Sequence, residues 1–195
     1  MKIPMLRLIA IPCILAGLVS YSQLKFPVTN NDLRTNLSKI ISDYPNQFGS
    51  LKGDTIAIHP QTIEFSSRLD FKEAPQNSII LYKSQKPVYS WQGVLVNTED
   101  FDEASKKYKW LYNQLKVMTV KLESGYSFTL SGEYDAPDES KKFSSSIFKL
   151  TPNAGNMPKL KIEASMQFEF PEWKVMLVVY EREREDIERG HINGD

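Results

Sequence analysis

The feature that most constrains the fold is a long alternation of apolar and polar residues near the C-terminus. Between Leu160 and Phe170, apolar side chains occupy every second position over eleven residues. Successive side chains of a strand point to opposite faces, so this run predicts one long strand with an apolar face and a wet face. A sheet with one face in water is antiparallel. The next segment, Trp173 to Tyr180, has four consecutive apolar residues and predicts a central strand that is buried on both faces.

Two segments, about 31–44 and 98–116, show the spacing of amphipathic helices. The first follows several N-capping side chains at 29–32 and ends before Pro45. Its apolar residues recur three or four positions apart, at Leu33, Leu37, Ile40, Ile41 and Tyr44.

In the second helical segment the cap, the apolar stripe and the charges agree. Asn97 or Thr98 is the expected cap, and acidic residues fill the first turns while lysines fill the rest, which complements the helix dipole. The stripe consists of Phe101, Ala104, Tyr108, Leu111 and Leu115.

The other segments alternate as strands do, so the sequence predicts an α+β protein with a mainly antiparallel sheet of about eight or nine strands and both helices packed on it. One helix precedes about four strands, and the second precedes about five. Two arrangements fit this order. One is a single curved sheet with both helices on one face, and the other is a tandem of two helix-plus-four-strand units that meet near residue 97.

The first 22 residues predict a secretory signal peptide. Lys2 and Arg7 precede an uncharged run from Leu8 to Val19, and twelve helical residues rise about 18 Å, too little for a hydrocarbon core of about 30 Å. A buried helix or an uncleaved anchor is the alternative, and Cys13 lacks the small preceding residue of a lipoprotein signal. Cleavage before Gln23 leaves a domain at 23–182, a charged tail at 183–195 and no transmembrane helix.

Composition excludes several functions. The 195 residues hold 24 basic and 24 acidic side chains, which gives no basic surplus for nucleic acid. One Cys and two His leave little for a metal site or a Cys/His catalytic pair, and no cofactor motif is present. Without residues 1–22 the chain keeps 173 residues, no cysteine, and 22 basic against 24 acidic side chains.

Trp110 is the one residue that the apolar stripe does not explain. It lies on the second helix about 130° from the stripe centre, among Lys106, Lys109 and Asn113. Aromatic anchors dominate small interfaces, so these four residues form a candidate binding site. The alternative is a second packing layer, in which another segment folds over Trp110.

The layout resembles small exported proteins of Bacteroidetes that have no assigned function. The resemblance rests on a signal ending in Tyr21-Ser22-Gln23, an amphipathic helix, and the segment Phe48 to Gly53. It implies export to the periplasm or surface of a Gram-negative bacterium.

Three functional hypotheses follow from these observations. The leading one is a non-enzymatic binding module with a protein or glycan partner in the envelope. The alternatives are a small envelope hydrolase, which a pocket with two carboxyls of raised pKa would favour, and a partner that pairs through an open sheet edge.

Overall fold

The computed structural model describes residues 30–122, 125–152, 157 and 159–181. The predicted signal peptide with Cys13 and the predicted tail at 183–195 lie outside these residues. The helices are α1 (Asn31–Asp43) and α2 (Phe101–Lys116), with short 3-10 turns η1 (Tyr44–Asn46) and η2 (Glu139–Lys141). The strands are β1 (Lys52–Ile58), β2 (Thr62–Ser67), β3 (Gln76–Tyr82), β4 (Val88–Thr98), β5 (Thr119–Lys121), β6 (Ser127–Gly132), β7 (Phe143–Thr151), β8 (Leu160–Glu169) and β9 (Glu172–Glu181).

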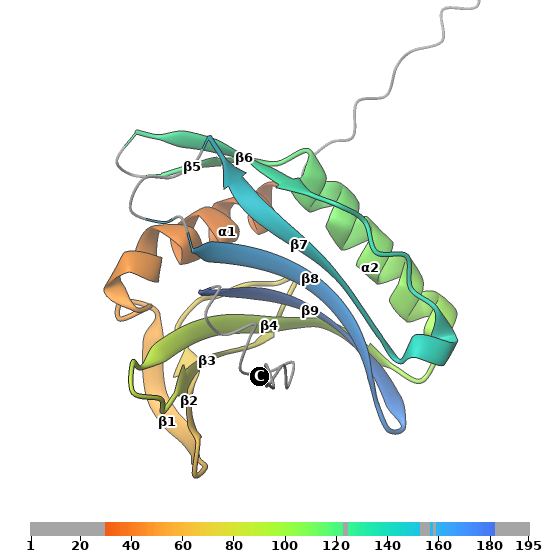
Figure 1. Ribbon diagram of the computed structural model, residues 1–195, viewed down its shortest axis with the longest axis horizontal. Coiled ribbons are helices and arrows are strands. Elements are labelled where there is room, and N and C mark those ends of the chain that lie inside the picture. The colour runs from red at the N-terminus through yellow and green to blue at the C-terminus, as the bar shows by residue number, and fades with distance from the viewer. Residues whose placement is uncertain (1–29, 123–124, 153–156, 158, 182–195) are drawn as a thin grey trace, which may run out of the picture.

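The nine strands form one antiparallel sheet in the order β1-β2-β3-β4-β9-β8-β7-β6-β5 (Figure 1). This confirms the predicted α+β class and the single sheet. The chain order still consists of a helix with a four-strand meander and then a helix with a five-strand meander. The two meanders join edge to edge where β4 pairs with β9, so the sheet is continuous across the chain segment that separates them.

Both helices begin at a side-chain cap. The Asn30 Oδ1 accepts the N–H groups of Asp32 and Leu33 at the start of α1, as the sequence predicts for this region. Helix α2 starts later than predicted, because β4 continues to Thr98. The cap is therefore Asp100, whose Oδ1 accepts the N–H groups of Asp102 and Glu103. The expected caps, Asn97 and Thr98, belong to the strand.

The hydrophobic core lies between the two helices and one face of the sheet. The buried side of α1 and that of α2 contribute to the same apolar cluster, together with alternate residues of β9 such as Val175, Leu177 and Val179. Strand β9 is the fifth of nine, and Val178 on its other face is also buried, which confirms the predicted central strand. Among the residues described, no helix combines the length and apolarity needed to cross a membrane.

Among the described residues, the opposite face of the sheet carries no helix, and its burial differs from the prediction. Strand β8 alternates as expected, but Lys161 and Ser165 on the supposedly wet face are only 4% and 3% exposed. Figure 1 shows the long strands bowed around this face, with the helices on the outer side. Alternation reports which face a residue takes but not how far its surroundings shelter it. We call this surface the helix-free face.

Candidate functional site

Strands β6 and β7 separate at one end and leave a hollow between them. Their pairing runs from Thr129 opposite Thr151 to Gly132 opposite Phe148, whereas β7 continues as far as Phe143 against β8. The space over the last pairs of this ladder and the segment that follows β6 has a volume of about 970 Å³. We call it the β6–β7 hollow, and it is lined by Ser131, Gly132, Glu133, Tyr134, Asp135, Phe143, Ser145, Ile147 and Lys149.

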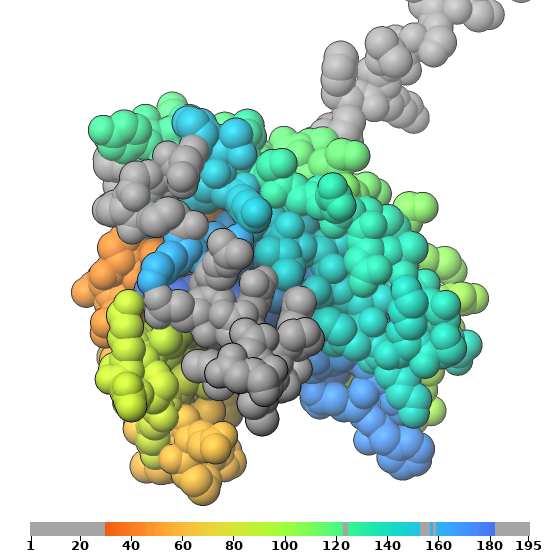
Figure 2. Space-filling view, viewed as in Figure 1, coloured from red at the N-terminus to blue at the C-terminus, as the bar shows by residue number. Residues whose placement is uncertain are grey.

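The hollow opens on the helix-free face. Phe148 and Leu150 of β7 point into the helix-side core, so the odd-numbered residues Ser145, Ile147 and Lys149 point the other way. In Figure 2 the teal segment after β6 and the start of β7 occupy the right-hand part of the viewed surface. The β6–β7 hollow therefore lies on the same face around which the long strands of the sheet curve.

Gly132 allows the two strands to close at their last paired position. A Cβ atom on Gly132 would lie 2.5 Å from the carbonyl oxygen of Ile147 and 2.9 Å from the ring of Phe148. The Tyr112 hydroxyl on α2 donates to the Gly132 carbonyl oxygen over 3.4 Å. A side chain here would push β6 away from β7 and reshape the mouth of the hollow.

One wall of the hollow is held by a buried hydrogen-bond network. The hydroxyls of Tyr108 and Ser146 share a hydrogen bond of 2.7 Å, and the Asp135 N–H donates to the Ser146 Oγ over 3.1 Å. The Ser145 N–H donates in turn to the Asp135 Oδ2 over 3.1 Å. Helix α2, β7 and the segment after β6 are thus fixed to one another at this wall.

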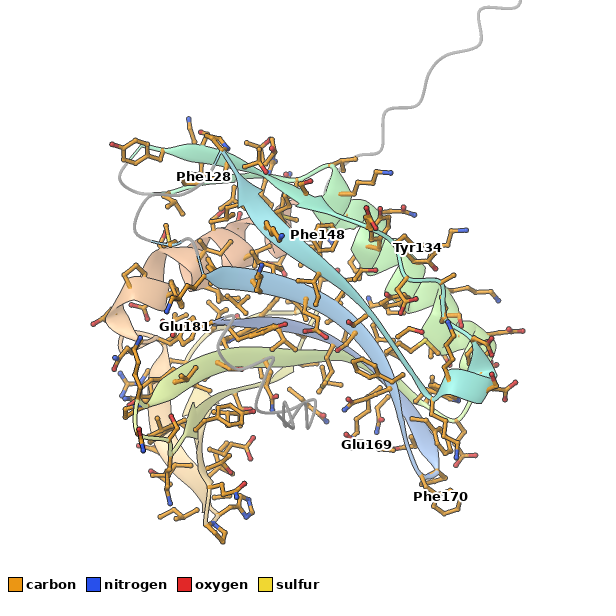
Figure 3. All side chains as sticks on the ribbon, viewed as in Figure 1. Phe128, Tyr134, Phe148, Glu169, Phe170 and Glu181 are labelled. Carbon is orange, nitrogen blue, oxygen red and sulfur yellow. The ribbon has the colours of Figure 1, made fainter. Side chains whose placement is uncertain are left out.

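Aromatic packing reinforces the same wall. The ring of Tyr134 lies 5.7 Å from that of Tyr108 and 4.8 Å from that of Tyr112, between the segment and α2 (Figure 3). Tyr112 also packs against Phe148 at 5.5 Å. The ring of Tyr134 therefore serves the interior rather than the opening.

The electrostatic setting keeps these phenols neutral. Burial raises the pKa of Tyr108 far above its ordinary value, the hydrogen bond from Ser146 opposes the shift, and the charge of Asp135 adds to it. Burial also raises the pKa of Tyr134, with a further contribution from Asp135. At neutral pH both hydroxyls act as hydrogen-bonding and packing groups. In the segment between β6 and β7, the hydrogen bond from the Ser140 hydroxyl lowers the pKa of the Asp138 carboxyl.

Polar side chains continue from the hollow across the helix-free face. One row in register runs from Ile147 through Glu163, Val178 and Gln92 to Ser78. The Gln92 Nε2 donates to the Ser78 Oγ over 3.3 Å, and the Tyr180 hydroxyl donates to the Glu163 Oε2 over 2.7 Å. The face thus carries a mixed row of polar and apolar side chains, some of whose polar members are hydrogen-bonded to their neighbours.

The sequence-predicted site on α2 is brought together only in part. Trp110 is half-buried against the core, and with Lys106 it lines a separate hollow of about 440 Å³. Lys109 and Asn113 are exposed on α2 and do not line that hollow. The other lining residues are Leu95, Val96, Glu103 and Lys107.

Lys107 covers the Trp110 ring. Its Nζ lies 4.2 Å from the ring centroid and forms an ion pair of 3.1 Å with Glu73. The β4–β9 register shifts between Val94 and Val96, and consecutive residues of β4 at this bulge line the hollow beside Trp110. Trp110 therefore lies in a second layer that joins α2 to β4 and to the segment before β3.

Sequence reasoning did not select the residues of the β6–β7 hollow. Ser131 and Glu133 are visible in the sequence only as polar partners in an alternating strand. Lys149 has the Ser-x-x-Lys spacing of a catalytic signature with Ser146, but in a strand residues three apart point to opposite faces. The usable signal was Gly132 inside an alternating run, because a glycine within a strand marks a close backbone approach. Which strand approaches it depends on long-range register.

The site has no recognised counterpart. The described residues contain no group of three or more His, Cys, Asp or Glu side chains that could hold a metal ion. Comparisons with protein-family models, with curated proteins and with solved structures gave no match.

Proposed function

We propose that this protein is an exported, non-enzymatic binding module that holds an extended peptide segment of an envelope partner in the β6–β7 hollow. The observation that carries the proposal is the hollow itself, a space of about 970 Å³ on the helix-free face whose wall is fixed by buried hydrogen bonds. A rigid wall lowers the entropic cost of binding, because little of it must be ordered when the ligand arrives.

The lining suits a peptide. Phe143 and Ile147 offer apolar contacts, Ser131 and Ser145 offer hydroxyls, and Glu133 and Lys149 offer charges of both signs. An extended peptide presents apolar and polar side chains alternately along its length and has polar backbone groups throughout. A mixed lining of this kind offers contacts to the apolar side chains, the polar side chains and the backbone groups of such a peptide.

A glycan is the less favoured ligand. Sugar rings stack on open aromatic faces, and the ring of Tyr134 packs instead against Tyr108 and Tyr112. In the α2 hollow the Lys107 ammonium covers the Trp110 ring. Phe143 is the exposed aromatic ring of the β6–β7 hollow, so a glycan would have one ring to stack on there and none at Tyr134 or Trp110.

Binding is favoured over catalysis by the chemistry of the wall. A hydrolase of the kind considered above needs two carboxyls with raised pKa values, whereas along the described wall the raised pKa values belong to the phenols of Tyr108 and Tyr134. One oxygen of the Asp135 carboxylate is already occupied by the Ser145 N–H. These groups hold the wall in place rather than transfer protons.

An array of short synthetic peptides of systematically varied sequence, probed with labelled protein, tests the binding proposal. Ser131→Trp fills the hollow and Lys149→Glu replaces the lysine of its lining with an acid, so both are expected to abolish retention of selected peptides. Asn113→Trp and Lys109→Glu make the same changes on the exposed side of α2 and should leave binding intact. Loss of binding only in the α2 variants would overturn the assignment, and peptide cleavage on the array would support a hydrolase.

Export has its own test. N-terminal sequencing of the protein from the envelope fraction is expected to begin at Gln23, because the basic start and short apolar run of residues 1–22 are typical of a cleaved signal. A chain that keeps Met1 in that fraction, or is confined to the cytoplasmic fraction, would contradict the export proposal without touching the peptide site.

A further inference from the structure

A second groove lies between α1 and the β5–β6 hairpin, at the end of the sheet. Its volume is about 460 Å³. Strand β5 is the terminal strand of the sheet, and α1 packs beside it. We call this space the α1–β5 groove, and its lining residues are Arg34, Thr35, Ser38, Lys39, Ser42, Thr119, Lys121 and Ser127.

The groove is lined by side chains of α1 and β5 that point away from the hydrophobic core. The apolar side of α1 enters the core, so Thr35, Ser38 and Ser42, which lie three or four residues apart, form a polar row on another side of the helix. On β5 the buried residue is Val120, which leaves Thr119 and Lys121 directed away from the core.

The charge of the groove is of one sign. Arg34, Lys39 and Lys121 contribute three cations, and none of the described lining residues is acidic. The chain as a whole has 24 basic and 24 acidic residues, so a surplus confined to one groove does not follow from composition. The Arg34 Nη2 donates to the neutral Asn31 Oδ1 over 2.5 Å, and Arg34 forms no ion pair with the other residues that the structure describes.

The hydroxyls supply hydrogen-bond donors beside the cations. Ser38 Oγ already donates to the Arg34 carbonyl oxygen over 2.9 Å. The hydroxyls of Thr35, Ser42, Thr119 and Ser127 line the same groove and make side-chain hydrogen bonds to none of the other residues that the structure describes. They are available to an incoming acceptor.

We propose that the α1–β5 groove binds a phosphate ester. A phosphate monoester presents several acceptor oxygens and a negative charge of about −1.5 to −2. It therefore matches a group of cations and hydroxyls better than a single carboxylate does. A space of about 460 Å³ also leaves room for the sugar or glycerol that carries the phosphate. The ester belongs either to a soluble phosphorylated sugar or to a phospholipid headgroup.

Two ligand arms separate these sources. In the first, calorimetry measures binding of glucose 6-phosphate, with glucose as the neutral comparison. In the second, co-sedimentation measures binding to vesicles of phosphatidylglycerol in phosphatidylcholine, with vesicles of phosphatidylcholine alone as the comparison. Both arms use the mature chain and are repeated at raised salt, which weakens binding through charge.

The variant Arg34→Gln, Lys39→Gln, Lys121→Gln removes the groove cations. Its matched control, Lys72→Gln, Lys106→Gln, Lys109→Gln, removes three exposed lysines elsewhere. The groove variant is expected to bind at least tenfold more weakly, roughly the loss of one or more charge-assisted hydrogen bonds, while the control keeps its affinity. Thermal unfolding of both variants verifies that the fold is intact.

Either arm supports the proposal when binding needs the phosphate and fails in the groove variant alone, and the arm that responds identifies the source of the ester. Absence of binding in both arms, or equal weakening in the two triple variants, would overturn it. The peptide site is tested by different residues and different probes, so a failure of one proposal leaves the other standing.

Discussion

Ser146 is the residue on which the wall of the β6–β7 hollow depends. It is only 1% exposed, and its hydroxyl meets both the Tyr108 hydroxyl and the Asp135 N–H. A buried donor that loses its acceptor cannot turn to water, so its desolvation cost remains unbalanced. One small side chain therefore couples α2, β7 and the segment after β6.

We expect Ser146→Ala to lower the free energy of unfolding by about 1–3 kcal/mol, because the Asp135 N–H and the Tyr108 hydroxyl both lose a partner. Urea unfolding followed by circular dichroism measures the loss. Ser144→Ala is the control, since Ser144 is equally buried on the same strand and its hydroxyl makes no hydrogen bond to the described residues. Equal losses in the two variants would contradict the role given to Ser146.

Stability is expected to fall at alkaline pH. Burial raises the pKa of Tyr108 above the ordinary tyrosine value of about 10, so the folded state holds this proton more tightly than the unfolded state does. The contribution is complete below the unfolded pKa and is lost as pH rises through it toward the folded pKa. Unfolding free energies measured from about pH 8 to 11 should decline less steeply in Tyr108→Phe. Parallel slopes would refute the burial effect.

At the scale of elements, one glycine allows β6 to approach β7 closely at their last paired position. Gly132→Ala is expected to cost about 1–3 kcal/mol, because its Cβ would meet the Ile147 carbonyl oxygen and the Phe148 ring and both belong to packed backbone or core. Gly125→Asn is the control, since Gly125 has φ near +85° and open space around it, and Asn tolerates that conformation. Denaturant midpoints compare the two, and equal midpoints would argue against the clash.

The contact of α2 with its surroundings can be followed by tryptophan fluorescence. Trp91 and Trp173 are 0% and 5% exposed, whereas Trp110 is half-buried, so Trp110→Phe should remove most of the emission that acrylamide quenches. Glu73→Gln releases Lys107 from the ring and is expected to increase quenching. Unchanged quenching in Trp110→Phe would show that Trp110 is as buried as the other two.

At the scale of the whole molecule, the two helix-and-meander segments share one sheet and one core. The β4–β9 pair joins them along seven residues of β4, and residues of α1, α2 and both meanders belong to the same apolar cluster. We expect a single cooperative unfolding transition, with tryptophan fluorescence and far-ultraviolet circular dichroism coincident. Two separated transitions would instead indicate two domains that meet near residue 97.

Local signals predicted the elements, and long-range register decided the rest. The alternation of Leu160 to Phe170 and the apolar run of β9 sufficed for an antiparallel sheet with β9 at its centre. Leu69 and Phe71 continued the alternation of β2 but lie in the connection to β3, where they are buried without pairing. A two-residue period cannot distinguish a paired residue from a loop residue that folds into the core.

The candidate sites follow the same division. The offset of Trp110 from the stripe of α2 agrees with its helical position. Leu95, which lines the same hollow, and Glu73, which pairs with the Lys107 above the ring, come from segments that no local pattern links to Trp110. The β6–β7 hollow depends on where Gly132 meets Phe148, and the α1–β5 groove on which strand ends the sheet. These are properties of pairing between segments far apart in the chain.

The central place of β9 also bears on how the chain is made. Strands β4 and β8 each need β9 as a neighbour, so until the last described strand has been synthesised both keep a row of unpaired backbone groups. Contacts between distant segments form slowly, and here the decisive one waits until β9 has been synthesised. A nascent chain of this topology therefore keeps two open strand edges until β9 emerges, so the sheet cannot be completed strand by strand in chain order.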